Sequence, residues 1–142
     1  MLFRSGNDKV HRLFASPRAE EAAYYKRTGV YPIMHVLCVR EKALAQHPGL
    51  AAHLFELFSQ SKALGRKWAR GTPSLNLAWK DDYLEEERRI FGGDPCVFGL
   101  DANRSTLEKF LGFCYDQGIS AKRIAPQDLF ARETWALREE TK

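Results

Sequence analysis

"RTGVYPIMHVLCVR", residues 27 to 40, is the stretch of sequence that decides the fold class. Gly29 and Pro32 give it a turn at its start, and a nearly unbroken apolar run follows. A strand over 31–40 would place two mainly apolar sets on opposite faces: Ile33, His35, Leu37 and Val39 on one, and Met34, Val36, Cys38 and Arg40 on the other. The stretch therefore predicts a strand covered on both sides, as in a sheet between helices.

Helices are predicted on both sides of this strand. Ser16 and Pro17 open one before it and Gly29 ends it, because serine caps helices, proline suits the first helical position and glycine ends them. After the strand we expect helices over "EKALAQ", 49–70, "DDYLEEERRIFG", "LDANRSTLEKFLGFCYDQG" and "APQDLFA". In the fourth of these, Leu107, Phe110, Leu111 and Cys114 are expected to face inward.

The predicted elements include only one clear strand, and they include no second strand that could pair with it. Its backbone groups need hydrogen bonds and its faces need cover. Either weak strands lie in 1–15 and 72–79, or the chain is part of a larger protein. We therefore expect the chain by itself to expose a large apolar face, or to cover that face by self-association.

Composition narrows the class of protein. The chain has 142 residues, of which 44% are hydrophobic and 28% charged, with a net charge of +4. These values predict a single globular domain and give little support to a nucleic-acid surface. Three widely spaced cysteines, with no C-x-x-C pair, favour a reducing compartment. The first residues lack the apolar region of a signal peptide, and no stretch is long enough to cross a membrane.

Four segments, taken in order, resemble the C-terminal part of the 4,5-dihydroxyphthalate decarboxylases. They are "YYKRTGVYPIMHVLCVR", "HPGLAAHLFELFSQSKAL", "FGLDANRSTLEKFLGFCYDQGIS" and "APQDLFARET". The resemblance runs from about residue 10 to 135. The family is related in fold to the type 2 periplasmic solute-binding proteins, which have two α/β lobes around a cleft.

The resemblance implies an α/β fold that is mostly helical, with one buried strand at 31–40. Residues 1–30 would end the second lobe and approach the hinge. Residues 31–142 would form the hinge strand and the helical C-terminal part of the first lobe. The missing N-terminal half of the chain would then be a partner, and a homo-oligomer is a further possibility.

The function implied is decarboxylation of an aromatic dicarboxylate such as 4,5-dihydroxyphthalate to 3,4-dihydroxybenzoate. Activity is expected of the complete enzyme rather than of this portion. The phenol para to the leaving carboxylate pushes electrons into the ring, an acid protonates the ring carbon, and cationic or hydrogen-bonding groups hold the anion. No cofactor is expected.

The candidate site residues are few, and each has an alternative interpretation. His35 is the candidate catalytic acid, because an imidazole exchanges protons near neutral pH; it could equally be a core histidine. Arg27 would bind a carboxylate, or complement the end of a helix. Tyr31 would hydrogen-bond a phenol oxygen. Asn103 would contact substrate or cap a helix.

Two other functions stay open at this point. The same fold serves as the substrate-binding component of ABC transporters for small organic anions, which would place the protein in the periplasm rather than the cytoplasm. A helical module that acts by association is the third hypothesis. No metal site is predicted, because His47 and His53 do not share a helix face and no paired cysteines occur.

Overall fold

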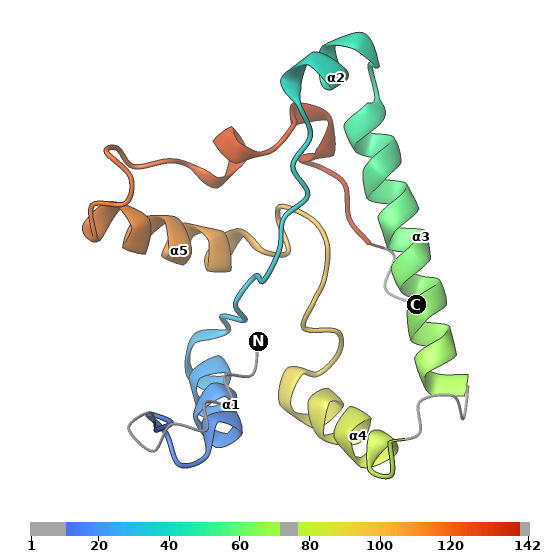
Figure 1. Cartoon of the computed structure of the whole chain (residues 1–142), viewed down its shortest axis with the longest axis vertical. Helices are drawn as coiled ribbons and strands as arrows, with labels where there is room; N and C mark the ends of the chain where they lie inside the picture. The colour runs from blue at the N-terminus through green and yellow to red at the C-terminus, as the bar shows by residue number, and fades with distance from the viewer. Residues whose placement is uncertain (1–10, 72–76, 140–142) are drawn as a thin grey trace.

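The computed structural model describes residues 11–71 and 77–139. The described helices are α1 (Pro17–Thr28), α2 (Glu41–Gln46), α3 (Leu50–Gly71), α4 (Lys80–Phe91) and α5 (Arg104–Asp116), followed by the short 3₁₀ helices η1 (Pro126–Leu129) and η2 (Arg132–Thr134). They form an open frame, with α3 along one side, α5 on the other, and α1 and α4 together at one end (Figure 1). The predicted helices are therefore confirmed within a few residues, with "APQDLFA" shortened to the 3₁₀ turn η1.

Local signals explain where α1 begins and ends. Pro17 occupies its first turn, and Gly29 closes it in the left-handed conformation at φ 65°. Such a positive φ is nearly free for glycine and costly for other residues. The helix lies beside α4, where the rings of Tyr25 and Phe91 meet edge to face at 4.6 Å and Arg18 pairs with Glu86. These contacts join the two helices at one end of the frame.

Few side chains are buried in the described part of the chain, and none is fully buried. The buried apolar residues are Val30, Leu100, Leu107 and Leu111. Leu107 and Leu111 form the inner face of α5, as predicted, and η1 packs against that helix with Pro126 buried. A core this small leaves many other apolar side chains in contact with solvent.

The beginning of α3 is held by a residue from the far end of the chain. Glu133 of η2 accepts hydrogen bonds from the backbone N–H groups of Gly49, Ala51 and Ala52, at 3.1, 2.8 and 3.4 Å. The first N–H groups of a helix have no partner within the helix, and a carboxylate there also suits the helix dipole. Glu133 therefore fixes the C-terminal segment to the start of α3.

The predicted buried strand at 31–40 is wrong, and with it the α/β fold class. No strand occurs in 11–71 or 77–139. Residues 31–40 instead form an extended connection from α1 to α2 that is mostly exposed, with Met34 at 75% and Leu37 at 59% exposure. The backbone of 31–39 makes no hydrogen bond to another described residue. A strand exists only with a paired neighbour, and the described residues place none beside the segment.

The inward placement of Phe110 is also wrong, because its side chain is 60% exposed on α5. Trp68 and Trp79 are exposed as well. The weak strands considered in 1–15 and 72–79 fall largely on residues outside the described ranges. Among the described helices, none has the length and apolar character to span a membrane.

Candidate functional site

The loop that joins α4 to α5 is shaped by its own polar side chains. Asp94 accepts a hydrogen bond from the Cys96 N–H at 2.9 Å. The Asn103 side-chain amide donates to the carbonyl oxygens of Val97 and Gly99, at 2.7 and 2.9 Å. These hydrogen bonds fold the 94–99 loop back over the start of α5.

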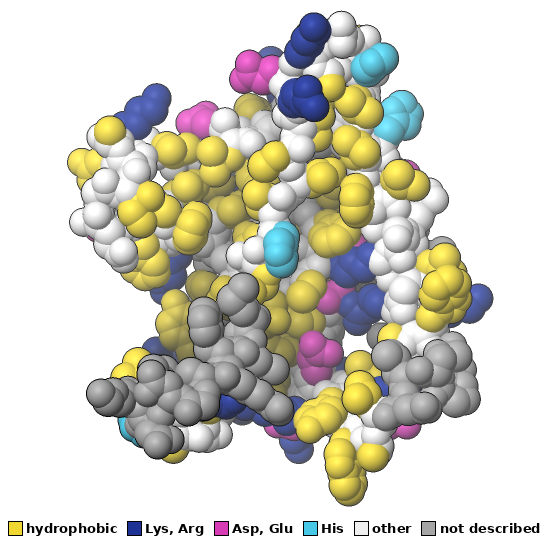
Figure 2. Space-filling view, in the orientation of Figure 1, with side chains coloured by type: hydrophobic (Ala, Val, Ile, Leu, Met, Phe, Trp, Pro, Cys, Tyr) yellow, Lys and Arg dark blue, Asp and Glu magenta, His cyan; other side chains and the backbone are white. Residues whose placement is uncertain are grey.

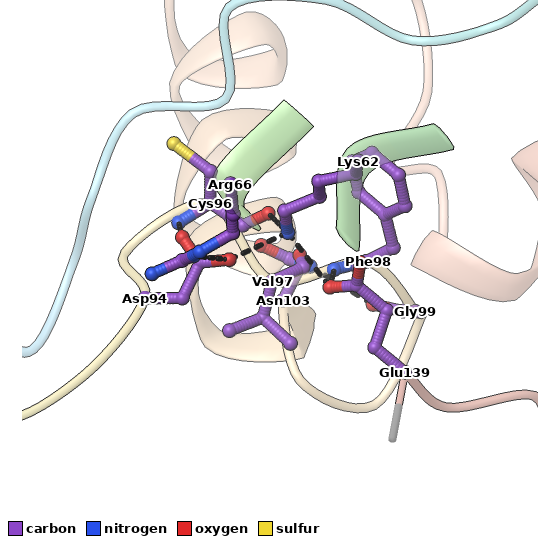
Figure 3. A network of polar contacts seen from close by, with 9 residues as sticks. All are labelled: Lys62, Arg66, Asp94, Cys96, Val97, Phe98, Gly99, Asn103 and Glu139. Carbon is purple, nitrogen blue, oxygen red and sulfur yellow. Dashed lines mark hydrogen bonds and ion pairs between the residues drawn. The ribbon is translucent and has the colours of Figure 1, made fainter. Parts of the chain in front are cut away.

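Lys62 connects this loop to two distant parts of the chain (Figure 3). Its ammonium group lies 2.7 Å from an oxygen of Asp94 and 2.8 Å from an oxygen of Glu139, and it donates to the carbonyl oxygen of Cys96. It also sits 4.3 Å from the centre of the Phe98 ring, within range of a cation–π interaction. Helix α3, the 94–99 loop and the C-terminal segment therefore meet at one cation.

Two further contacts complete this charged cluster, which consists of Lys62, Arg66, Asp94 and Glu139. Arg66 pairs with Asp94, and Glu139 accepts a hydrogen bond from the Phe98 N–H at 2.7 Å. The side chains of Lys62, Asp94 and Glu139 are only 17%, 18% and 12% exposed. Two cations face two carboxylates, so the cluster is neutral and its charges compensate one another.

Hydrogen bonding sets the ionisation of Asp94. Burial by itself raises the pKa of this carboxyl, but hydrogen bonds from Lys62, the Cys96 N–H and Arg66 outweigh it and leave the pKa below its ordinary value. All three N–H groups of Lys62 are already engaged. The charged cluster therefore positions the loop, and Lys62 has no N–H group left for a further acceptor.

Tyr31 approaches the same loop from the other side. Its ring meets Phe91 edge to face at 5.2 Å, and its hydroxyl neighbours the Cys96 thiol. Burial, together with Cys96, raises the pKa of Tyr31, and burial with the charge of Asp94 raises the pKa of Cys96. Tyr31 is thus a neutral hydroxyl that can donate a hydrogen bond, and Cys96 is a thiol rather than a reactive thiolate.

The structure brings two of the four predicted site residues to this loop. Tyr31 reaches it at Cys96, and Asn103 supports it through Val97 and Gly99. Arg27 is exposed near the end of α1, with its guanidinium 5.5 Å from the Tyr24 ring centre. His35 is exposed in the 31–40 connection, so it is not a core histidine here. The catalytic and substrate-binding roles of all four stay predictions.

Sequence reasoning missed the charged cluster. Lys62 and Glu139 are 77 residues apart, and no spacing rule links them. The available signal was local: Lys62 and Arg66 share one side of α3, and Asp94 precedes Cys96 by two residues, a common turn pattern. Among residues 11–71 and 77–139, no group of three or more histidine, cysteine or acidic side chains is arranged to hold a metal ion.

The chain is similar to a known enzyme. It is 34% identical over 130 residues to 4,5-dihydroxyphthalate decarboxylase of Comamonas testosteroni. The match covers 90% of this chain but 39% of that relative, so the chain spans well under half of the relative's length. No protein-family profile matches the chain. The resemblance noted in the sequence is confirmed by this match.

Two glycines should respond in opposite directions to replacement by alanine. Gly99 has φ +119°, and a Cβ there would lie 2.9 Å from the backbone oxygen of Leu137. We expect Gly99→Ala to lower the free energy of unfolding by about 1–3 kcal/mol. Gly112 lies inside α5, and an added Cβ would meet nothing within 4 Å, so Gly112→Ala should raise it by about 0.5–1 kcal/mol. Urea unfolding followed by circular dichroism measures both; equal effects would contradict the described loop.

The lowered pKa of Asp94 predicts a pH dependence of stability. Near pH 4 the unfolded chain binds more protons than the folded chain, so the free energy of unfolding rises with pH. The contribution is present above the ordinary carboxyl pKa and is lost as pH falls through the lowered value. Asp94→Asn should therefore flatten the stability curve between about pH 5 and about pH 3.

The matched control for this test is Glu108→Gln, on the exposed side of α5. Unfolding in urea at a series of pH values should give the same slope for this control as for the unchanged chain. An Asp94→Asn chain with an unchanged slope would show that the charged cluster does not hold Asp94 ionised.

Proposed function

We propose that this chain is part of a carbon–carbon lyase that decarboxylates an aromatic dicarboxylate such as 4,5-dihydroxyphthalate, giving 3,4-dihydroxybenzoate and CO₂. The observation that carries the proposal is the 34% identity to 4,5-dihydroxyphthalate decarboxylase over nearly the whole chain. The match covers only 39% of that relative. We therefore propose the activity for a longer protein, which contains this chain together with a counterpart of the relative's unmatched part. Three free cysteines fit a cytoplasmic location.

The reaction sets what the site must supply. The phenol oxygen para to the leaving carboxylate donates electrons into the ring, and protonation of the carbon that bears the carboxylate lets the C–C bond break. The bonding electrons then restore the aromatic ring as CO₂ leaves. A side chain must deliver one proton to that carbon, and cations must hold the second carboxylate.

We assign these roles to residues that the sequence nominated. His35 delivers the proton, Arg27 binds the remaining carboxylate, and Tyr31 donates a hydrogen bond to a phenol oxygen. Support for Tyr31 comes from its raised pKa, which keeps its hydroxyl protonated. Support for His35 comes from its exposure, which leaves its imidazole accessible to a ligand. Asn103 acts through the 94–99 loop that it holds.

His35→Asn, in a protein that contains this chain and an equivalent of the relative's remaining length, should reduce turnover by about 10²- to 10⁴-fold with little loss of stability. A group that only packs would instead lower the melting temperature and leave turnover per folded molecule nearly unchanged. CO₂ release from 4,5-dihydroxyphthalate and thermal unfolding are measured on one preparation.

His47→Asn is the matched control, since His47 lies at the end of α2, away from the residues assigned here. Turnover of the control should equal that of the unchanged protein. A His35→Asn protein with full turnover per folded molecule would remove His35 from the mechanism, and absence of any decarboxylation by the unchanged protein would remove the proposed function.

A further inference from the structure

Helix α3 turns its polar side toward the rest of the chain and its apolar side toward solvent. Lys62 and Arg66 point to the 94–99 loop and the C-terminal segment through the charged cluster. Leu57, Leu64 and Trp68 lie along a different side of the helix and are 61%, 48% and 63% exposed. An amphipathic helix on the surface of a globular protein shows the opposite arrangement, with its apolar stripe packed against the core.

One side of α3 has the spacing of a helix-packing seam, half-buried at Leu50 and Leu54 and exposed from Leu57 onward. Its residues follow one another at alternating intervals of four and three, which keeps them on one line of the helix: Leu50, Leu54, Leu57, Ser61, Leu64 and Trp68. We call this line the α3 seam. A second exposed apolar set, Ile33, Met34, Val36 and Leu37, lies on the 31–40 connection. In the space-filling view, hydrophobic side chains gather across the middle of the face between α5 and α3 (Figure 2).

The solvent-accessible surface area of the chain is larger than that of a compact protein of the same mass. A compact protein of 16.3 kDa exposes about 7,500 Å², whereas this chain exposes 12109 Å². The surplus is roughly 4,600 Å² on one chain. Large obligate dimers bury about 1,000–2,500 Å² on each partner. A second copy docked on the α3 seam would therefore leave much of the surplus bare.

We propose that the α3 seam and the exposed side chains of Ile33, Met34, Val36 and Leu37 dock a polypeptide equivalent to the part of the decarboxylase relative that lies outside the match. This inference rests on the proposed function, because both use the sequence similarity to the decarboxylase. The unmatched part is longer than this chain, since the match covers 39% of the relative, so it is large enough to cover the surplus surface. The seam spacing indicates that the contact on α3 is made by a helix or another closely packed apolar surface.

Co-expression tests the proposal. This chain, carrying an affinity tag, is produced together with the untagged, unmatched part of Comamonas testosteroni 4,5-dihydroxyphthalate decarboxylase. The expected result is one complex containing one copy of each polypeptide, with its mass measured by light scattering. Leu57→Glu combined with Leu64→Glu should reduce recovery of the untagged polypeptide at least tenfold, because two charges would be buried unpaired in the seam.

Ala63→Glu is the matched control. It adds one negative charge, half of what the seam variant adds, to the same helix, one position away from Leu64, at an exposed residue off the seam. Circular dichroism confirms that the seam variant retains its helices, as expected for side chains that face solvent in this chain.

Two outcomes would overturn the proposal. One is tagged chain that purifies without the second polypeptide, and the other is a stable dimer of this chain that Leu57→Glu with Leu64→Glu dissociates. Both are read from mass and composition rather than from catalysis. A complex that forms but does not decarboxylate would leave the docking surface established and the proposed function refuted.

Discussion

The arrangement of this chain depends on one cation. Lys62 binds Asp94, the carbonyl oxygen of Cys96 and Glu139, and so joins α3 to the 94–99 loop and to the C-terminal segment. Few apolar side chains are buried, so this contact carries more of the architecture than a single ion pair carries in a protein with a large core. Glu133 adds the second long-range connection, at the start of α3. The two together fix which side of α3 faces inward.

That orientation explains the most unusual property of the molecule. Lys62 and Arg66 form ion pairs on the side of α3 that faces the rest of the chain. Leu57, Leu64 and Trp68 lie on another side of the helix and are therefore exposed to solvent. The 31–40 connection shows the same condition, with apolar side chains exposed and backbone groups unpaired to other described residues. Both features fit the proposed docking of a polypeptide equivalent to the unmatched part of the relative.

The sequence predicted what is local and failed where partners are distant. Pro17, Gly29 and the apolar spacing of α5 act within one helix, so they placed the helix ends and the buried Leu107 and Leu111 correctly. The run at 31–40 is apolar on both faces and predicted a buried strand, but it is mostly exposed, because burial and strand pairing require neighbours and none lies beside it among the described residues. The charged cluster could not be predicted from the sequence, because nothing near Lys62 or Glu139 distinguishes them from ordinary surface charges. Tyr31 and Asn103 were nominated by resemblance, and the structure adds that both contact the 94–99 loop.

The proposed interface between the α3 seam and the rest of a larger protein can be followed by the fluorescence of Trp68. Trp79→Phe with Trp135→Phe leaves Trp68 as the single tryptophan of this chain, and the co-expressed polypeptide is prepared with its own tryptophans replaced by phenylalanine. If the α3 seam docks this polypeptide, Trp68 emits like a water-exposed indole in the chain alone; in the complex its emission shifts to shorter wavelength and acrylamide no longer quenches it. Emission that is already shifted in the chain alone, or unchanged in the complex, would contradict the proposed interface.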